Sequence, residues 1–73
     1  MFNCPENIIT ENLQVKFSRD NADFYVEIRS LKDGRELAFH GDDLFANNVA
    51  RLAKKFDNFG TVVNGARVLL ENP

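Results

Sequence analysis

The fold is decided by residues 35–60, RELAFHGDDLFANNVARLAKKFDNFG, because the spacing of the large apolar side chains changes within this stretch. Leu37 and Phe39 alternate with smaller or polar neighbours, which is the period of two of a half-buried strand. After Gly41 the apolar residues recur at the spacing of one helix face: Phe45, Val49, Leu52, Phe56 and Phe59. Asp42 or Asp43 can cap this helix, and Gly60 can end it.

Two more strands precede this stretch. Segments 13–18 and 24–29 each alternate apolar with polar residues, and the polar segment 20–23 between them predicts a turn. Asp33 and Gly34 form a two-residue type I′ signal, which predicts a hairpin from the second strand into the third.

The register of this second hairpin follows from the turn. If the two-residue turn alone closes the hairpin, Ile28 faces Phe39, so the apolar residues of both strands share one side of the sheet. The same register places Glu27 opposite His40 on the other side.

The two ends of the chain have weaker patterns. Residues 1–11 have no clean period and are predicted to be irregular, apart from a short helical turn after Pro5. Segment 61–70 contains an Asn-Gly pair at 64–65, so it forms either a tight hairpin or a turn followed by one strand. The second option, with a strand over 66–70, is favoured.

The chain is therefore predicted to be a single α+β domain, residues 1–73. Its expected order is three strands, one helix and a fourth strand, with the amphipathic helix packed on one face of a small antiparallel sheet. A core of this size is near the limit of independent stability, and seven Phe residues without any Trp suit it. The single Cys4 excludes an internal disulfide, and no apolar run is long enough for a membrane span. We expect a soluble, cytoplasmic protein.

Charge is unevenly distributed along the chain. The net charge is −2, but residues 1–43 carry nine acidic against five basic side chains. Residues 44–73 reverse the balance, with two acidic and four basic side chains. The predicted sheet half is acidic and the predicted helix half is basic, a polarity that affects partner choice and association rates.

No catalytic or cofactor motif accompanies this fold. His40 lies near acidic residues, but no Ser or Cys is placed to act as its nucleophile, so a surface cross-strand contact is the expected role. The glycines lie at predicted turns and helix ends and match no phosphate-binding spacing. We expect a non-enzymatic protein without a metal or cofactor.

The exposed side of the predicted helix carries the candidate nucleic-acid contacts Arg51, Lys54 and Lys55. Three strands followed by a helix resemble the last elements of the double-stranded RNA-binding domain, in which lysines at the start of that helix bind phosphates. Here the helix begins with Asp42-Asp43 instead, and the net charge is negative. A nucleic-acid-binding accessory domain is therefore the second of two functional hypotheses.

The first hypothesis is a protein-interaction module that occupies a basic surface of a larger partner and is itself a monomer or a homodimer. One helix leaves a sheet face uncovered, and tyrosine and arginine beside acids are typical of binding hot spots. The predicted contacts are Asp20, Asp23, Tyr25, Glu27, Arg29, Leu31 and Glu36. In size, charge and architecture the chain is similar to inhibitors that phages and mobile elements direct against host nucleic-acid machinery, including anti-CRISPR and anti-restriction proteins.

Overall fold

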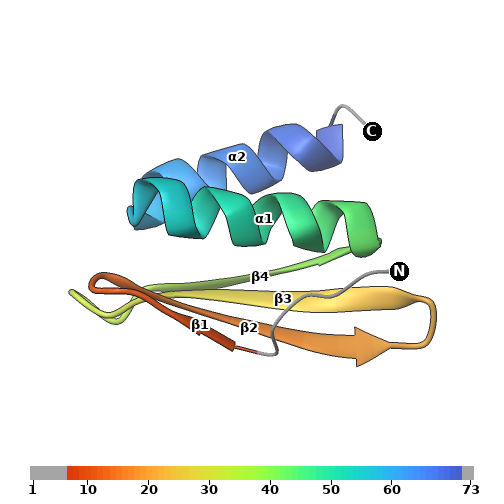
Figure 1. The fold of residues 1–73 in the computed structure, drawn as a ribbon, viewed down its shortest axis with the longest axis horizontal. Helices are drawn as coiled ribbons and strands as arrows, with labels where there is room; N and C mark the ends of the chain where they lie inside the picture. Colours follow the sequence, from red (N-terminus) through yellow and green to blue (C-terminus); the bar gives the residue numbers. More distant parts are fainter. Residues whose placement is uncertain (1–6, 72–73) are drawn as a thin grey trace.

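A computed structural model describes residues 7–71 of the protein as a four-stranded antiparallel sheet followed by two helices (Figure 1). The elements are β1 (Asn7–Ile9), β2 (Leu13–Asp20), β3 (Asp23–Ser30), β4 (Glu36–Gly41), α1 (Asp43–Phe56) and α2 (Phe59–Glu71). The α+β class is confirmed. The predicted element order is wrong, because all strands precede the helices.

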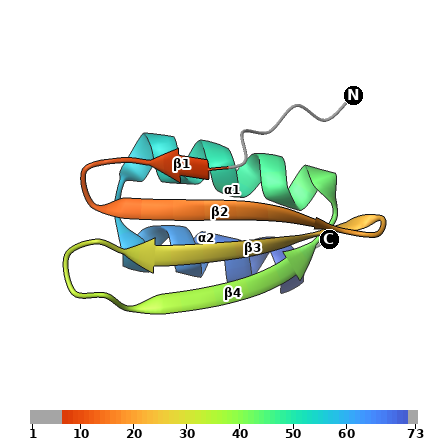
Figure 2. The same ribbon diagram turned by 90° about the horizontal axis from the view of Figure 1, so that it is seen from below.

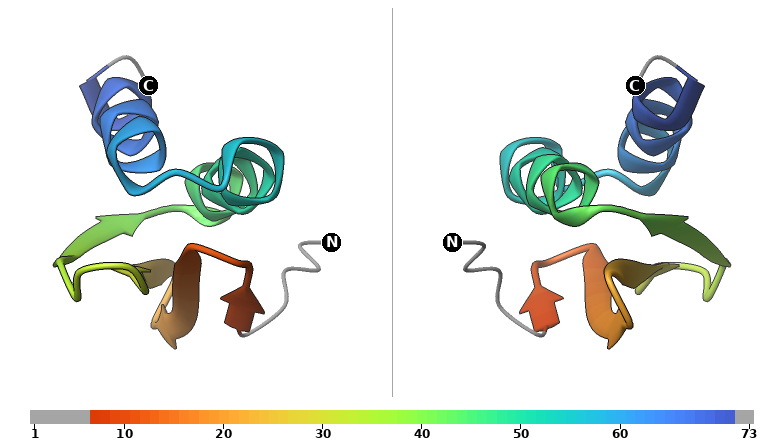
Figure 3. Two further views of the ribbon diagram at one scale, coloured as in Figure 1. Left: turned by 90° about the vertical axis from the view of Figure 1, so that its left-hand side faces the viewer. Right: turned by 90° about the vertical axis from the view of Figure 1, so that its right-hand side faces the viewer.

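The sheet is a simple meander in the order β1-β2-β3-β4, and both helices cover the same face of it (Figures 2 and 3). Helix α1 packs over β2 and β3, and α2 packs over β3 and β4. Two helices, and not the predicted single one, therefore form the second layer. Neither helix is long and apolar enough to cross a membrane.

The predicted alternation in the central hairpin is confirmed. Val15 pairs with Ile28 and Phe17 with Val26, and all four side chains are buried beneath the helices. The turn consists of Asn21 and Ala22, and Asn21 adopts a positive φ of 59°, a conformation that asparagine tolerates. The largest core thus lies between this hairpin and the two helices.

The predicted register between β3 and β4 is wrong by two residues. Val26, and not Ile28, faces Phe39, while His40 faces Tyr25. A type I′ turn requires positive φ at both central residues, and in this loop only Gly34 has it, at 78°. The loop is therefore four residues long, closed by a 2.8 Å hydrogen bond from the Ser30 N–H to the Arg35 carbonyl. A shift of two residues preserves the faces, so the apolar side of β4 is still the predicted one.

Hydrogen bonds within this loop fix its shape. Asp33 accepts a bond from the backbone N–H of Arg35 at 3.2 Å and from its Nε at 2.8 Å. The bond from the Arg35 backbone, followed by one from the Ser30 hydroxyl, lowers the pKa of the Asp33 carboxyl.

The N-terminal segment forms a strand where a short helical turn was predicted. Ile8 pairs with Val15 and is buried, while Ile9 is 66% exposed on the other side of the sheet. This alternation over three residues is too short to distinguish from a helical turn in the sequence. Cys4 and Pro5 lie outside the described residues.

The predicted strand over 66–70 is also wrong, because this segment lies within α2. The residues of α2 that are buried against the sheet have helical spacing: Phe59, Val62, Val63 and Ala66. Gly65 is helical and allows close contact with α1, since a Cβ atom there would lie 2.7 Å from Cδ1 of Leu52. Gly60 lies in the first turn of α2 and does not end α1.

Helix α1 begins as predicted, and its buried face is rotated from the predicted one: Phe45 and Val49 are buried as predicted, but Leu52 and Phe56 are not. The Asp42 side chain caps it by accepting a 2.8 Å hydrogen bond from the Phe45 N–H. The residues buried against the sheet include three alanines: Phe45, Ala46, Val49, Ala50 and Ala53. Leu52 is only half-buried and Phe56 is 47% exposed, because both lie on the side of α1 that faces α2.

The junction between the helices is bound to the first turn of the sheet. Asp57 ends α1 in the left-handed conformation, with φ 48° and ψ 41°. Its carboxylate accepts hydrogen bonds from the Thr10 hydroxyl, from the Asn12 N–H at 3.1 Å and from Asn12 Nδ2 at 3.2 Å. Asn12 Nδ2 also donates to the Asp57 carbonyl at 3.3 Å. These bonds connect residues that are 45 to 47 positions apart in the chain.

We predict that Asp57→Ala lowers the free energy of unfolding by about 2–4 kcal/mol, because it removes bonds to a charged acceptor and adds strain at positive φ. Asp57→Asn should cost less, since asparagine tolerates this backbone conformation. Urea denaturation followed by circular dichroism measures the difference. Glu11→Ala, an exposed carboxylate in the same β1–β2 turn, is the control. Equal unfolding midpoints for Asp57→Ala and Glu11→Ala would contradict the assigned role.

Candidate interaction surfaces

In the part of the chain that the structure describes, no helix covers the face of the sheet opposite α1 and α2 (Figure 3), and most side chains of the central strands on this face are polar. Three rows of side chains cross its central strands: Gln14, Arg29 and Glu36; Lys16, Glu27 and Ala38; Ser18, Tyr25 and His40. Opposite charges are neighbours within two of these rows, so the middle of this face is close to neutral. Its charged residues therefore form stabilising cross-strand pairs, and they produce little net electrostatic potential.

An aromatic pair occupies the third row. The rings of Tyr25 and His40 lie 4.9 Å apart between centroids, tilted by 52°. Tyr25 is half-buried and belongs to a central strand, so its orientation is fixed by the pairing on both sides. The pair is a rigid amphipathic feature beside the polar rows of the central strands.

Next to this pair the fold brings acidic residues of separate segments to one end of the molecule. Asp20 and Asp23 close the β2–β3 hairpin, and the neighbouring Phe24 pairs with Gly41, which precedes Asp42 and Asp43. Helix α2 also ends here, on the right in Figure 1. We define the acidic end as Asp20, Asp23, Asp42, Asp43 and Glu71. Arg19 precedes Asp20 in the chain, and its guanidinium carbon lies 5.8 Å from the centroid of the Phe24 ring.

The structure unites part of the predicted partner-binding set. Asp20, Asp23 and Tyr25 lie together at the acidic end. Glu27, Arg29 and Glu36 follow on the same open face but farther along the strands. Leu31 lies in the β3–β4 loop at the opposite end of the sheet and does not join them. Asp42 and Asp43 were not in the predicted partner-binding set, because their position near Asp23 depends on the register of β4.

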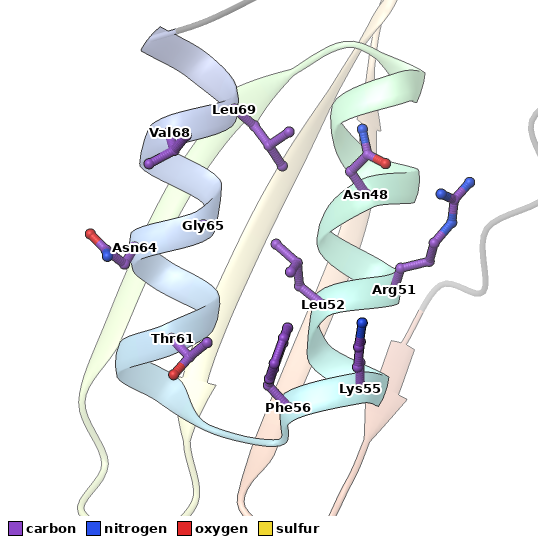
Figure 4. A pocket seen from close by; sticks show the side chains of 10 residues that line it. All are labelled: Asn48, Arg51, Leu52, Lys55, Phe56, Thr61, Asn64, Gly65, Val68 and Leu69. Carbon is purple, nitrogen blue, oxygen red and sulfur yellow. The ribbon is translucent and has the colours of Figure 1, made fainter.

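A second surface lies on the outer side of the helix layer, between α1 and α2. It is a hollow of about 590 Å³, and Figure 4 shows Leu52, Phe56 and Leu69 directed into it. The Nζ atom of Lys55 lies 5.4 Å from the centroid of the Phe56 ring. The hollow is lined by Asn48, Arg51, Leu52, Lys55, Phe56, Thr61, Asn64, Gly65, Val68 and Leu69.

The predicted nucleic-acid contacts are divided by this hollow. Arg51 and Lys55 line it, whereas Lys54 is exposed and is not part of its lining. The apolar part of the hollow was not predicted, because half of it belongs to α2 and this segment was predicted to contain a turn and a strand. The strong helical spacing of Phe59, Val62, Val63 and Ala66 was the available signal.

Within residues 7–71, no three His, Cys, Asp or Glu side chains are grouped to hold a metal ion. The same residues include no buried side-chain nitrogen or oxygen without a hydrogen-bond partner. The expectation of a non-enzymatic protein stays a prediction.

Comparison with known proteins gives no relative: no protein-family model, curated protein or solved structure matches the chain.

We predict that the protein does not bind DNA or RNA at moderate ionic strength, because the basic residues of α1 flank an apolar surface in an acidic protein. Gel-shift titrations over a salt series, with the triple variant Arg51→Ala, Lys54→Ala and Lys55→Ala as comparison, measure this. A salt-sensitive micromolar shift that the triple variant abolishes would establish the nucleic-acid hypothesis instead.

Proposed function

We propose that the protein is a non-enzymatic interaction module that binds a basic surface of a larger protein through its acidic end and the adjoining open sheet face. The observation that carries this proposal is the position of the Tyr25–His40 pair beside carboxylates contributed by the β2–β3 hairpin, the start of α1 and the end of α2.

The two parts of this surface have different roles. Carboxylates at one end of a small protein attract a basic partner over a distance and accelerate encounter. A half-buried tyrosine held by two neighbouring strands loses little conformational freedom on binding and can fill a pocket in the partner. The surface thus combines steering with an anchor.

The partner class follows from this charge. Proteins that handle nucleic acids present clustered lysine and arginine side chains to phosphates. An acidic end that occupies such a cluster competes with the nucleic acid. This action is that of an inhibitor from a phage or mobile element, of the anti-CRISPR or anti-restriction type, and it takes place in the cytoplasm.

We expect Asp23→Lys combined with Asp43→Lys to slow association with the partner several-fold, because both exposed residues contribute to the field of the acidic end. Tyr25→Ala should instead raise the dissociation rate, since it removes buried contact. The partner is first isolated by affinity capture from a lysate and identified by mass spectrometry, and surface-bound kinetics then compare the variants.

The matched control is Glu11→Lys, which lies at the opposite end of the sheet and makes the same charge change as either single variant, Asp23→Lys or Asp43→Lys. Its association rate should be close to wild type. Equal slowing by Glu11→Lys and by each single variant would mean that net charge alone matters and that the acidic end is not the contact surface.

A further inference from the structure

The hollow between the helices continues along the whole helix pair. A second hollow of about 240 Å³ lies beyond it and is lined by Gly41, Asp42, Leu44, Phe45, Asn48, Leu69 and Leu70. The two hollows share Asn48 and Leu69, so they form one seam between α1 and α2. We call this seam, with the outer sides of both helices, the helix face.

Large apolar side chains are exposed at both ends of the helix face. Phe56 and Val68 are 47% and 51% exposed along the first hollow. Leu44 and Leu70 are 63% and 42% exposed beside the second. So many exposed apolar side chains on one side of a small domain are typical of an interaction surface.

The charges at the two ends of the helix face are opposite. Arg51, Lys54 and Lys55 lie on the later turns of α1. Asp42, Asp43 and Glu71 lie at the other end, where α1 begins and α2 ends. If a second helix face is laid on the first in the reversed direction, apolar residues meet apolar residues and bases meet acids.

We propose that the occupant of the helix face is a second copy of this chain. The two copies stack their helix layers about a two-fold axis that lies in the interface and perpendicular to the helices. Each α1 then crosses the antiparallel α1 of its partner, with the basic end of one above the acidic end of the other. A two-fold axis parallel to the helices would place both acidic ends together, so the charges select the first arrangement.

The size of the helix face sets the expected affinity. Helix α1 has 14 residues and α2 has 13, so each is about 20 Å long, and two helices side by side cover about 20 Å of width. The contact of roughly 400 Å² per copy is smaller than a stable specific interface and fits a weak, transient dimer, for which we expect a dissociation constant of about 10–100 μM. The dimer forms and dissociates with concentration.

This inference does not depend on the proposed function. The helix face and the open sheet face lie on opposite sides of the molecule (Figure 3). Dimerisation through the helices leaves both sheet faces with their Tyr25–His40 pairs exposed, whereas Asp43 and Glu71 of each acidic end contact the bases of the other copy. Dimerisation and partner binding would therefore compete for Asp43 and Glu71.

Sedimentation of the full chain, from about 5 μM to about 1 mM, tests the dimer directly. Phe56→Glu and Val68→Glu should each weaken dimerisation at least ten-fold, because they bring a charge into the apolar contact. Ile9→Glu is the matched control, since Ile9 is 66% exposed on the open sheet face, and its dimerisation should be unchanged. Circular dichroism establishes that each variant is folded.

Charge exchange tests the orientation. Lys54→Glu with Lys55→Glu, and separately Asp43→Lys with Glu71→Lys, should each impair self-association. An equimolar mixture of the two variants should restore a 1:1 dimer, because every reversed base then meets a reversed acid. A wild-type protein that stays monomeric over the whole concentration range would overturn the proposal. A dimer that weakens equally with Ile9→Glu, or that the mixture does not restore, would also overturn it.

Discussion

The bonds around Asp57 are the constraint on which the rest of the architecture depends. Because Asp57 adopts a left-handed conformation, the chain leaves α1 and reverses instead of extending the helix. Because its carboxylate is held by Thr10 and Asn12, this reversal occurs above the β1–β2 turn and at no other place. The guanidinium carbon of Arg35 lies 4.8 Å from the centroid of the Phe59 ring, so the β3–β4 loop also contacts the start of α2. Helix α2 is therefore directed back along α1. This direction creates the seam between the helices and brings the last turn of α2 to the acidic end.

A two-layer fold of this size has two chemically different outer surfaces. The strands alternate strictly, so the large core side chains on one face require small or polar ones on the other. The helices use alanines to approach the sheet, and this leaves their larger residues Leu44, Phe56 and Val68 on the outside. The sheet surface is consequently polar with one aromatic pair, and the helix surface is apolar with charged ends. Each surface suits a different kind of contact.

Periodicity in the sequence predicts the elements that have one buried and one exposed face. The central strands and α1 belong to this class, and their positions follow from the spacing of residues such as Val26 and Val49. The Asn-Gly pair at 64–65 misleads because its usual meaning is a turn, whereas here Gly65 is used for close contact with Leu52. The loop before β4 misleads for a related reason: Asp33 satisfies its carboxylate locally and lengthens the turn. At the Asn-Gly pair the turn signal yields to a contact made elsewhere in the chain, whereas in the β3–β4 loop it yields to other bonds within the loop.

The side chains that serve the fold and those that remain for binding can be separated by their contacts. Asp57 is fully committed, since its carboxylate accepts bonds from two residues of the β1–β2 turn. One oxygen of the Asp42 carboxylate is used for the fold, because it caps α1, and the positive end of the helix dipole offsets part of the charge of Asp42. Asp23, Asp43 and Glu71 lie exposed, so the field of the acidic end arises mainly from them. A partner can therefore bind there without competing for the bonds that hold the helices on the sheet. In a domain with so small a core, the residues that bind a partner must differ from the residues that stabilise the fold.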